Sequence, residues 1–407
     1  MTPPDTDVLP HTVTDVLQWP LPAGEHGTPP PLYATLRRER PVCPLRMPSG
    51  HTTWLLTRYD DITEVLTDPR FSRNLVYPGA PRLIGEDFNS VAGGIFNLDP
   101  PRHTRVRQIL NPLFNRGAAE RSSGDIAAHV DDLLAAMAAG SNPTDLVGAY
   151  TAPLALRVSC GLLRIPADRR AALHGFFREQ TSQNADRADV STATERIGTL
   201  AAEIIADKWS APDPAEPIGA LIAAHQADEI TSDELHGTVS YLLVTGVEPL
   251  VSSVSTGIVT LLRHPDELRA VRDDPSLWPA VVEEILRLHH NGYLSNPRVA
   301  LEDTEIRGVL IRAGESVVTP MIAATWDPDH YKNPHRFNIH RRTDGSRTFG
   351  AGPHFCLGAS LARAHLRIAF EALFTRFPTL ILAIAADELP WDEDNLFTRP
   401  LVLPVAW

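Results

Sequence analysis

The stretch Phe349-Gly350-Ala351-Gly352-Pro353-His354-Phe355-Cys356-Leu357-Gly358 is a glycine-rich loop that presents a single cysteine. Glycine lets the backbone adopt positive φ angles and pass close to a flat ligand, where a Cβ atom would collide. Apolar residues recur at helical spacing directly after the loop, so we expect Cys356 to lie near a helix N-terminus, which favours thiolate over thiol. Cys356 is therefore a candidate iron ligand. The alternative is a buried structural cysteine beside an ordinary turn.

Six residues of this loop follow the pattern F-G-x-G-x-H-x-C-x-G, and with it the sequence resembles the cytochrome P450 family of haem-thiolate monooxygenases, in its soluble bacterial form. The resemblance covers nearly the whole chain, from about residue 32 to residue 407. It implies a mainly α fold with a small β portion and a long central helix over haem b. It also implies that Cys356 is the axial thiolate ligand of the iron, in a loop whose other haem-contacting residues are Phe349, Gly350, His354 and Gly358.

The length, composition and net charge of the chain limit the classes of protein to which it can belong. The chain has 407 residues, 43% of them hydrophobic, which is ample for a large core. A net charge of -13 argues against non-specific binding to nucleic acid or to an anionic membrane surface. Three widely spaced cysteines indicate no disulfide framework and favour a reducing cytoplasm. We find no signal-peptide pattern and no apolar run of the roughly 20 residues that span a bilayer. We expect one cytoplasmic, monomeric domain over residues 1–407, with a proline-rich arm at residues 1–30.

Basic side chains suited to carboxylates occur in three separate segments. His103 and Arg107 lie four residues apart on a predicted helix and share a face, which alone would most often be a solvated basic face. The resemblance implies that both bind the haem propionates, together with Arg298 and His354. Charge-assisted hydrogen bonds of this kind would fix the orientation of the cofactor.

Glu284 and Arg287 lie at i and i+3 on one predicted helix face. Such a pair alone is usually a surface ion pair of little energetic weight. Its position upstream of the cysteine loop matches the E-x-x-R motif of the family, which implies a buried network that supports the haem face. We expect Arg336 to complete that network.

A long buried helix is predicted over residues 231–263, and its middle carries Thr245-Gly246-Val247-Glu248-Pro249. The family usually has threonine where this chain has Pro249, and that threonine helps to deliver protons during oxygen activation. Proline removes an N–H and clashes with the preceding turn, so the helix should kink and open locally. We predict that these residues shape an oxygen groove in which water or the substrate replaces the missing hydroxyl. The hydroxyls of Ser252 and Ser253 are less favoured candidates.

The resemblance implies oxidation of a small or medium organic molecule, a bacterial secondary metabolite, with electrons from NAD(P)H through ferredoxin reductase and ferredoxin. Hydroxylation or epoxidation is the commoner outcome in the family. Oxidative C–C, C–N or C–O coupling, ring closure or rearrangement without oxygen insertion is the alternative, which Pro249 favours. A peroxide-driven peroxygenase is disfavoured because Glu248 would repel a fatty-acid carboxylate. A haem sensor without turnover is a further alternative.

Three surface features complete the expectations. Residues 72–94 and 174–190 correspond by position to segments that cover the substrate in the family, and a turn at Phe397 and Thr398 is expected to touch it. A basic stretch near the thiolate side is opposed within its own range only by Asp344, and basic complementarity would speed docking of an acidic ferredoxin. We therefore expect charge reversal at Arg102 or Arg363 to weaken that docking. The basic stretch comprises Arg336, Arg341, Arg342, Arg347, Arg363 and Arg367.

Overall fold

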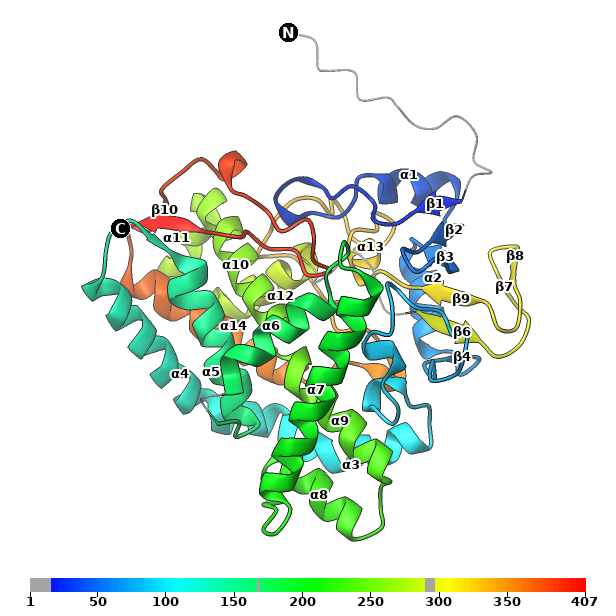
Figure 1. Cartoon of the computed structure of the whole chain (residues 1–407). Coiled ribbons are helices and arrows are strands. Elements are labelled where there is room, and N and C mark those ends of the chain that lie inside the picture. Colours follow the sequence, from blue (N-terminus) through cyan, green and yellow to red (C-terminus); the bar gives the residue numbers. More distant parts are fainter. Residues whose placement is uncertain (1–15, 167–168, 290–296) are drawn as a thin grey trace.

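The computed structural model describes residues 16–166, 169–289 and 297–407, so residues 1–15 of the expected arm lie outside the described residues. Helices dominate one side of the molecule, and most strands gather on the other side, as Figure 1 shows. This confirms the predicted mainly α fold with a small β portion. The helices are α1 Leu32–Glu39, α2 Tyr59–Thr67, α3 Arg102–Phe114, α4 Arg116–Ala139, α5 Ala152–Leu162, α6 Arg170–Gln180, α7 Arg187–Lys208, α8 Pro217–Gln226, α9 Ser232–Thr245, α10 Glu248–Arg263, α11 Pro265–Asp273, α12 Trp278–Leu288, α13 Met321–Thr325 and α14 Ala359–Arg376.

The strands form three small sheets. The largest has the order β1-β2-β3-β9-β6-β4. In it, β3 and β9 are parallel, and Leu55 pairs with Val318 and Trp54 with Val317, residues that lie 263 positions apart along the chain. A three-stranded sheet has the order β10-β11-β5, and β7 and β8 form a hairpin. The strands are β1 Leu17–Gln18, β2 Val42–Arg46, β3 Thr52–Leu56, β4 Phe71–Ser72, β5 Thr144–Asp145, β6 Arg298–Ala300, β7 Thr304–Ile306, β8 Val309–Ile311, β9 Ser316–Val318, β10 Ile381–Leu382 and β11 Pro404–Ala406.

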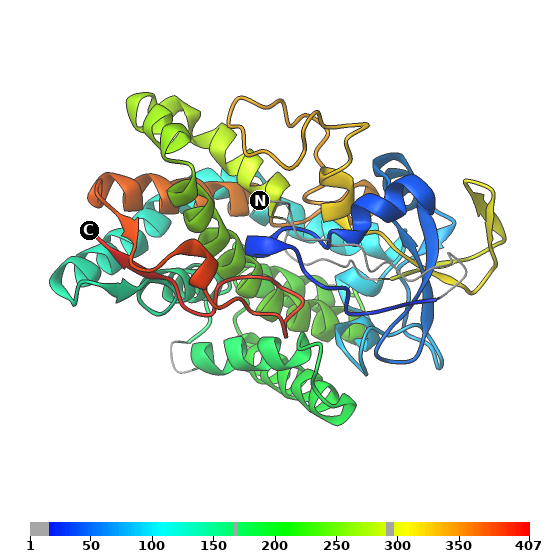
Figure 2. The ribbon, with the colours of Figure 1, turned by 90° about the horizontal axis from the view of Figure 1, so that it is seen from above.

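The central helix runs through the middle of the molecule in Figure 2, but it is broken into α9 and α10. Its start is a complete capping box, in which the backbone N–H of Glu234 donates to Thr231 Oγ1 and the backbone N–H of Thr231 donates to Glu234 Oε2. Each of these bonds satisfies an N–H group that the first turn would leave free. No apolar run long enough to span a bilayer was expected from the sequence, but Ser232–Arg263 is long and apolar enough by length and composition. Of its most apolar window of residues, 78% is buried inside the protein, as in the core helix of a globular domain.

Close packing between α10 and α14 holds the C-terminal end of the cysteine loop in position. A Cβ atom at Gly257 in α10 would lie 2.4 Å from Cζ of Phe370 in α14, so only glycine allows the two helices to approach this closely. The ring of Trp278, from α12, stacks against Phe370 and Phe374. Because α14 begins at Ala359, this apolar core holds the residue that follows the cysteine loop in place.

Candidate haem site

The cysteine loop is a tight backbone turn that ends at α14. The N–H of Cys356 donates to the carbonyl oxygen of Phe349 over 2.9 Å, which closes the loop on itself. Gly352 has a φ of +69°, and a Cβ atom there would lie 2.4 Å from the carbonyl oxygen of Leu66 in α2. A side chain at this position would therefore be both strained and in collision. The loop geometry requires this glycine whether or not a ligand is bound.

Gly358 has no such conformational reason to be glycine. Its φ is -85°, which any residue can adopt, and a Cβ atom built on it has no neighbour within 4 Å among the described residues. A flat group that passes close to this backbone explains the absence of a side chain. The loop therefore fits a haem on structural grounds as well as by its sequence pattern.

The thiol of Cys356 is exposed by surface area, whereas Cys43 and Cys160 are buried. Enough protein surrounds the Cys356 sulfur that burial raises the thiol pKa, while a hydrogen bond from Gly358 and the charges of Arg107 and Arg363 act in the opposite direction. The hydrogen bond from Gly358, directly before α14, acts in the direction expected of a helix N-terminus, but burial has the larger effect on this pKa. Coordination to a metal ion deprotonates a thiol outright, so an iron bound here would hold Cys356 as the thiolate.

The predicted propionate ligands come together in the structure. The rings of His103 and His354 lie 4.2 Å apart between centroids, and Arg107 Nη1 donates to the carbonyl oxygen of Phe355 over 2.8 Å. His354 Nε2 is buried and has no hydrogen-bond partner among the residues that the structure describes. Burial, and then the charges of His103 and of nearby arginines, hold the pKa of His354 far below its usual range. A donor of this kind, buried and unpaired, fits a carboxylate.

Arg298 joins this cluster, and so does Arg73, which no sequence motif marks. Burial, with a contribution from Arg73, lowers the pKa of Arg298 to about 9. Burial also lowers the pKa of Arg73 to about 10, and its guanidinium lies 4.1 Å from the centre of the Phe96 ring. Burial is the main cause of both shifts, so each of these guanidinium groups is costly to keep charged away from water without a close carboxylate partner. Two carboxylates at this place would offset that cost.

The E-x-x-R network is buried as expected, but its third member is a different residue. Arg287 binds both oxygens of Glu284, with its Nε atom at 2.7 Å and its Nη2 atom at 2.9 Å. The second positive charge beside Glu284 is that of Arg341, whose Nε lies 3.0 Å from Glu284 Oε1. The prediction of Arg336 was wrong, because its side chain is exposed and only its carbonyl oxygen takes part, as an acceptor from Arg287 and Arg341.

The central helix opens where the sequence predicts. Helix α9 ends at Thr245 and α10 begins at Glu248, with Pro249 in its first turn, because Pro249 has no N–H for the Thr245 carbonyl. The Thr245 hydroxyl donates to the Tyr241 carbonyl, so it does not face the break as a free donor. A Cβ atom at Gly246 would lie 3.0 Å from Ser159 Oγ, which keeps the break closely packed against α5.

Glu248 at this break is fully buried and strongly paired. Arg399 Nε lies 2.6 Å and Arg178 Nη1 lies 3.1 Å from Glu248 Oε1. Ser252 is also engaged, since its hydroxyl donates to the carbonyl of Thr398. The repulsion expected between Glu248 and a substrate carboxylate is therefore offset by two guanidinium groups. Neither arginine was predicted, because no local pattern links residues so far apart in the chain.

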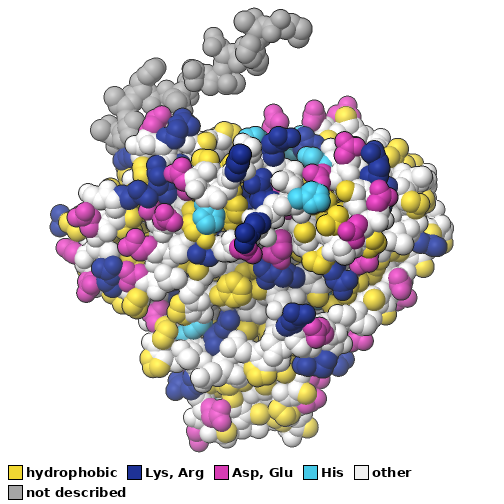
Figure 3. Space-filling model, turned by 180° about the vertical axis from the view of Figure 1, so that it is seen from behind, with side chains coloured by type: hydrophobic (Ala, Val, Ile, Leu, Met, Phe, Trp, Pro, Cys, Tyr) yellow, Lys and Arg dark blue, Asp and Glu magenta, His cyan; other side chains and the backbone are white. Residues whose placement is uncertain are grey.

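The basic stretch is less basic in the structure than in the sequence. Arg341 and Arg363 pair with Glu284 and Glu283 from α12, and Arg367 pairs with Glu371 one turn further along α14. In the face shown in Figure 3, Lys and Arg side chains accordingly lie interspersed with Asp and Glu side chains. Counting charges along the sequence overstated the positive field, because acids from other segments fold against these arginines.

A cysteine loop at the start of one helix, a broken central helix and a buried E-x-x-R network together define a haem-thiolate fold. A family model for cytochrome P450 matches residues 187–400. The chain is also 35% identical over 383 residues to nocardicin C N-oxygenase from Nocardia uniformis subsp. tsuyamanensis, which covers 93% of this chain and 95% of that protein. The protein belongs to the cytochrome P450 family, whose members are enzymes that carry an iron haem on a cysteine thiolate.

Two solved structures show the same architecture. One is the LnmA cytochrome P450 hydroxylase from the leinamycin biosynthetic pathway of Streptomyces atroolivaceus S-140, with a TM-score of 0.85 and 34% identity. The match covers 96% of this chain and 100% of the LnmA chain. The other is a cytochrome P450mel with biaryl coupling reactivity, with a TM-score of 0.89 and 33% identity over 97% of this chain and 100% of that chain.

Proposed function

We propose that this P450 is a tailoring monooxygenase that hydroxylates or epoxidises a small or medium bacterial secondary metabolite. The single observation that carries the proposal is the cluster of buried cationic groups beside the cysteine loop, with His354 Nε2 unpaired within the described residues. Cys356 would be the axial ligand, and Phe349, Gly350 and Gly358 would lie along the haem. His103, Arg107, Arg298 and His354 would hold the propionates. When bound, the haem supplies the reductive activation of dioxygen.

The residues of the helix break would serve the oxygen groove. Thr245, Gly246, Glu248 and Pro249 form the turn between α9 and α10, where the helical hydrogen-bond ladder is interrupted. The opened turn leaves backbone carbonyl groups that can bind water. Because no threonine occupies position 249 and Ser252 is already bonded, we expect water or a substrate hydroxyl to carry protons here. This assignment does not require any side-chain hydroxyl of α10.

Oxidative coupling or ring closure without oxygen insertion is the second candidate, and Pro249 is the observation that favours it. One structural neighbour is described by its biaryl coupling reactivity, whereas nocardicin C N-oxygenase and the LnmA hydroxylase are named for adding oxygen. The two candidates share every haem contact, so they differ only in what happens at the helix break.

Electrons would come from NAD(P)H through a ferredoxin reductase and a ferredoxin, with a monomeric enzyme in the cytoplasm. A partly basic surface near the cysteine loop supports ferredoxin docking, since Arg107 and Arg363 both act on the Cys356 thiol. Arg363 is 38% exposed although it is paired with Glu283, and it remains available to a partner. An acidic ferredoxin would compete with Glu283 for this guanidinium.

The deciding experiment is turnover under ¹⁸O-labelled dioxygen with ferredoxin, reductase and NADPH, after a screen for compounds that shift the haem absorption band. A product that carries one labelled oxygen atom supports hydroxylation or epoxidation. A product that has lost two hydrogen atoms and carries no label would overturn that proposal in favour of coupling or ring closure. Failure of ferredoxin, reductase and NADPH to reduce the iron in the presence of a compound that binds would instead indicate a haem sensor.

A further inference from the structure

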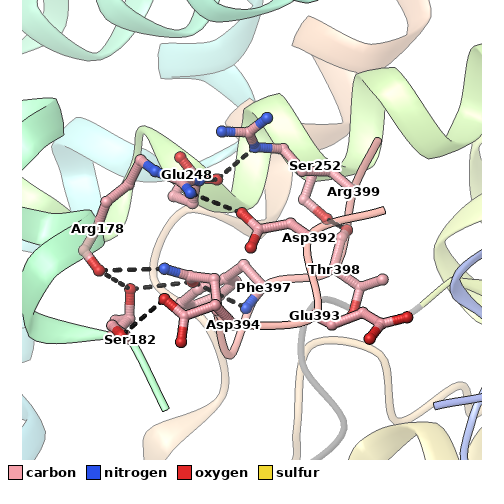
Figure 4. A network of polar contacts seen from close by, with 12 residues as sticks. Arg178, Ser182, Glu248, Ser252, Asp392, Glu393, Asp394, Phe397, Thr398 and Arg399 are labelled. Atoms are coloured by element: carbon pink, nitrogen blue, oxygen red, sulfur yellow. Dashed lines mark hydrogen bonds and ion pairs between the residues drawn. The ribbon is translucent and has the colours of Figure 1, made fainter. Parts of the chain in front are cut away.

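Six arginine side chains are buried among the residues that the structure describes, and four of them lie between 2.6 and 3.9 Å from a carboxylate oxygen. The pair of Arg399 and Glu248, which Figure 4 shows, is one example. The four paired arginines are Arg37, Arg82, Arg287 and Arg399. The two exceptions within the described residues are Arg73 and Arg298. Because a buried charge without a partner is costly, these two arginines require a counter-charge.

The pairing of β4 with β6 places the two exceptions opposite each other. Ser72, the last residue of β4, pairs with Val299 of β6 in an antiparallel register. One step further along this register, Arg73 lies opposite Arg298. Side chains in opposite positions share one face of a sheet, and like charges there are destabilising. After burial, the charge of Arg73 is the largest cause of the lowered pKa of Arg298, which agrees with this placement.

The guanidinium of Arg73 has only uncharged hydrogen-bond partners within the described part of the chain. Its Nη1 atom donates to the carbonyl oxygen of Pro297, and its Nη2 atom donates to Asn89 Oδ1 over 3.2 Å. Its Nε atom is buried and has no partner among the same residues. A guanidinium carries five N–H groups, so this one has donors left for a further acceptor.

The two acids whose charges act on Arg73 make their hydrogen bonds to other groups. Asp99 Oδ1 accepts from the backbone N–H of Arg73 over 2.9 Å, and Asp99 Oδ2 accepts from the Ser72 hydroxyl. Asp87 Oδ1 accepts from the side-chain amide of Asn89 over 2.9 Å, so Asn89 links Asp87 to the guanidinium of Arg73. A bound water would satisfy the Nε atom without offsetting the charge. The counter-charge must therefore come from an anion outside the chain.

Arg73 also lies close to the histidine of the cysteine loop. Its guanidinium carbon lies 4.1 Å from the centre of the Phe96 ring, and the edge-on rings of Phe96 and His354 lie 6.3 Å apart between centroids. Burial lowers the pKa of His354 most, and the charges of Arg298 and Arg73 lower it further. The three cationic or donor groups therefore converge on one place beside the cysteine loop.

We infer that Arg73 is a further haem-binding residue, whose guanidinium binds the same haem propionate as Arg298. A guanidinium presents its N–H groups in a planar fork that fits a carboxylate, and one carboxylate between the two groups offsets their mutual repulsion. The inference rests on the proposed assignment of the propionates. Through its contacts with Asn89 and Phe96, Arg73 ties the segment between β4 and α3 to the cofactor.

The test uses the resting, haem-loaded enzyme without substrate, so that no substrate carboxylate is present. Two quantities are measured, the rate at which haem transfers to apomyoglobin and the midpoint potential of the iron. Arg73→Gln removes the charge, and Arg73→Lys keeps it. The matched control is Arg82→Gln, because Arg82 is buried in the same segment and donates to the Leu75 carbonyl but already has Glu86 as its carboxylate.

We expect Arg73→Gln to release haem several-fold faster than the unchanged enzyme. Its midpoint potential should be lower, because a positive charge near the haem favours the reduced state. Arg73→Lys should recover most of the potential but only part of the haem retention, since an ammonium group lacks the planar fork. Arg82→Gln should change neither quantity. A merely structural role of Arg73 would speed haem release without recovery of the potential by lysine.

Unchanged haem release and potential in Arg73→Gln overturn the inference, and so do equal changes in Arg73→Gln and Arg82→Gln. A substrate carboxylate is the other source of the same chemistry. It is indicated if Arg73→Gln retains haem normally but binds dodecanoate more weakly, with the binding of methyl dodecanoate unchanged. That result also overturns the inference.

Arg73→Lys decides the question if Arg73→Gln does not accumulate with haem. Faster haem release in Arg73→Lys than in Arg82→Lys then supports the inference, and equal release overturns it. Arg298→Gln tests the proposed propionate assignment separately. If Arg298→Gln retains haem as the unchanged enzyme does, that assignment fails, whatever the result at Arg73. The absence of labelled oxygen from the product bears only on the proposed reaction.

Discussion

Arg399 Nε lies 2.6 Å from Glu248 Oε1, although 151 residues separate the two along the chain. Both side chains are almost fully buried, with 6% of Arg399 and 0% of Glu248 exposed. A carboxylate in this environment must be paired, because moving an unpaired charge out of water costs several kcal/mol. The pair also joins the C-terminal segment to the start of α10.

Replacing Arg399 with glutamine should lower the free energy of unfolding by roughly 3 kcal/mol, because the buried Glu248 would lose the guanidinium that lies 2.6 Å from its Oε1 atom. Denaturant unfolding of the haem-loaded protein measures this change. The double variant Arg399→Gln with Glu248→Gln should recover most of the loss, since it leaves no buried charge unpaired. A loss below about 1 kcal/mol in the single variant would show that the remaining partners of Glu248 balance its charge.

Arg341→Gln should destabilise the protein by roughly 3 kcal/mol and reduce haem loading, because Glu284 would lose one of its two buried charged partners. The matched control is Arg336→Gln, which removes an exposed side chain and should change stability by less than about 0.5 kcal/mol. The two variants are compared by unfolding midpoint and by haem content per protein. Equal losses in both would restore the assignment of Arg336 to the network.

Pro249→Thr should lower the share of electrons that is lost as hydrogen peroxide during turnover, because it adds a hydroxyl donor at the break between α9 and α10. The measurement is the ratio of peroxide formed to NADPH consumed, with a substrate from the binding screen. Pro249→Ala is the control that restores the backbone N–H without a hydroxyl. If threonine and alanine have the same effect, the hydroxyl is not the missing component.

The pKa of His289 is lowered to about 4, mainly by burial, and further by the charges of Arg287 and Arg263. Its Nε2 atom lies 2.6 Å from Thr260 Oγ1, so the ring is neutral and hydrogen-bonded in the folded protein. The unfolded chain takes up a proton near pH 6.5, whereas the folded chain does so near pH 4. This contribution to stability is fully present above pH 6.5 and is lost as the pH falls toward 4.

His289→Gln should therefore reduce the slope of unfolding free energy against pH between 6.5 and 4 by about 1.4 kcal/mol per pH unit, the effect of one proton. His340→Gln serves as the control, because the His340 side chain is exposed. The measurement is denaturant unfolding at a series of pH values. Identical slopes in the two variants would assign the acid sensitivity to other histidines.

Arg363→Glu should raise the apparent KM for ferredoxin several-fold at low ionic strength, with a smaller effect as salt screens the interaction. Because Arg363 pairs with Glu283, the haem content and unfolding midpoint of the variant must be checked alongside the kinetics. Arg196→Glu, in α7, reverses a half-exposed arginine on a different helix and should leave KM unchanged. Insensitivity of Arg363→Glu to ionic strength would argue against docking at this surface.

Interactions between residues close in the chain could be predicted from the sequence. The glycines of the cysteine loop, the Glu284–Arg287 pair at i and i+3, and the break before Pro249 all follow from backbone geometry within one or two turns. The motif around Cys356 placed the haem site for the same reason, since a fixed local spacing sets the loop conformation. The same features could be predicted in any chain that contains the same short segments.

Which distant side chains pair could not be predicted, because pairing depends on which segments pack together. Arg341 rather than Arg336 reaches Glu284, although both lie in one segment, since only the Arg341 side chain turns inward. Arg178 and Arg399 meet Glu248 from separate segments. The sequence by itself determined the fold and the cofactor through motifs that resemble those of the P450 family, and it determined the helix break through local geometry. Only the tertiary structure decided which charges are buried together, because a buried carboxylate takes its partners from whatever chain surrounds it.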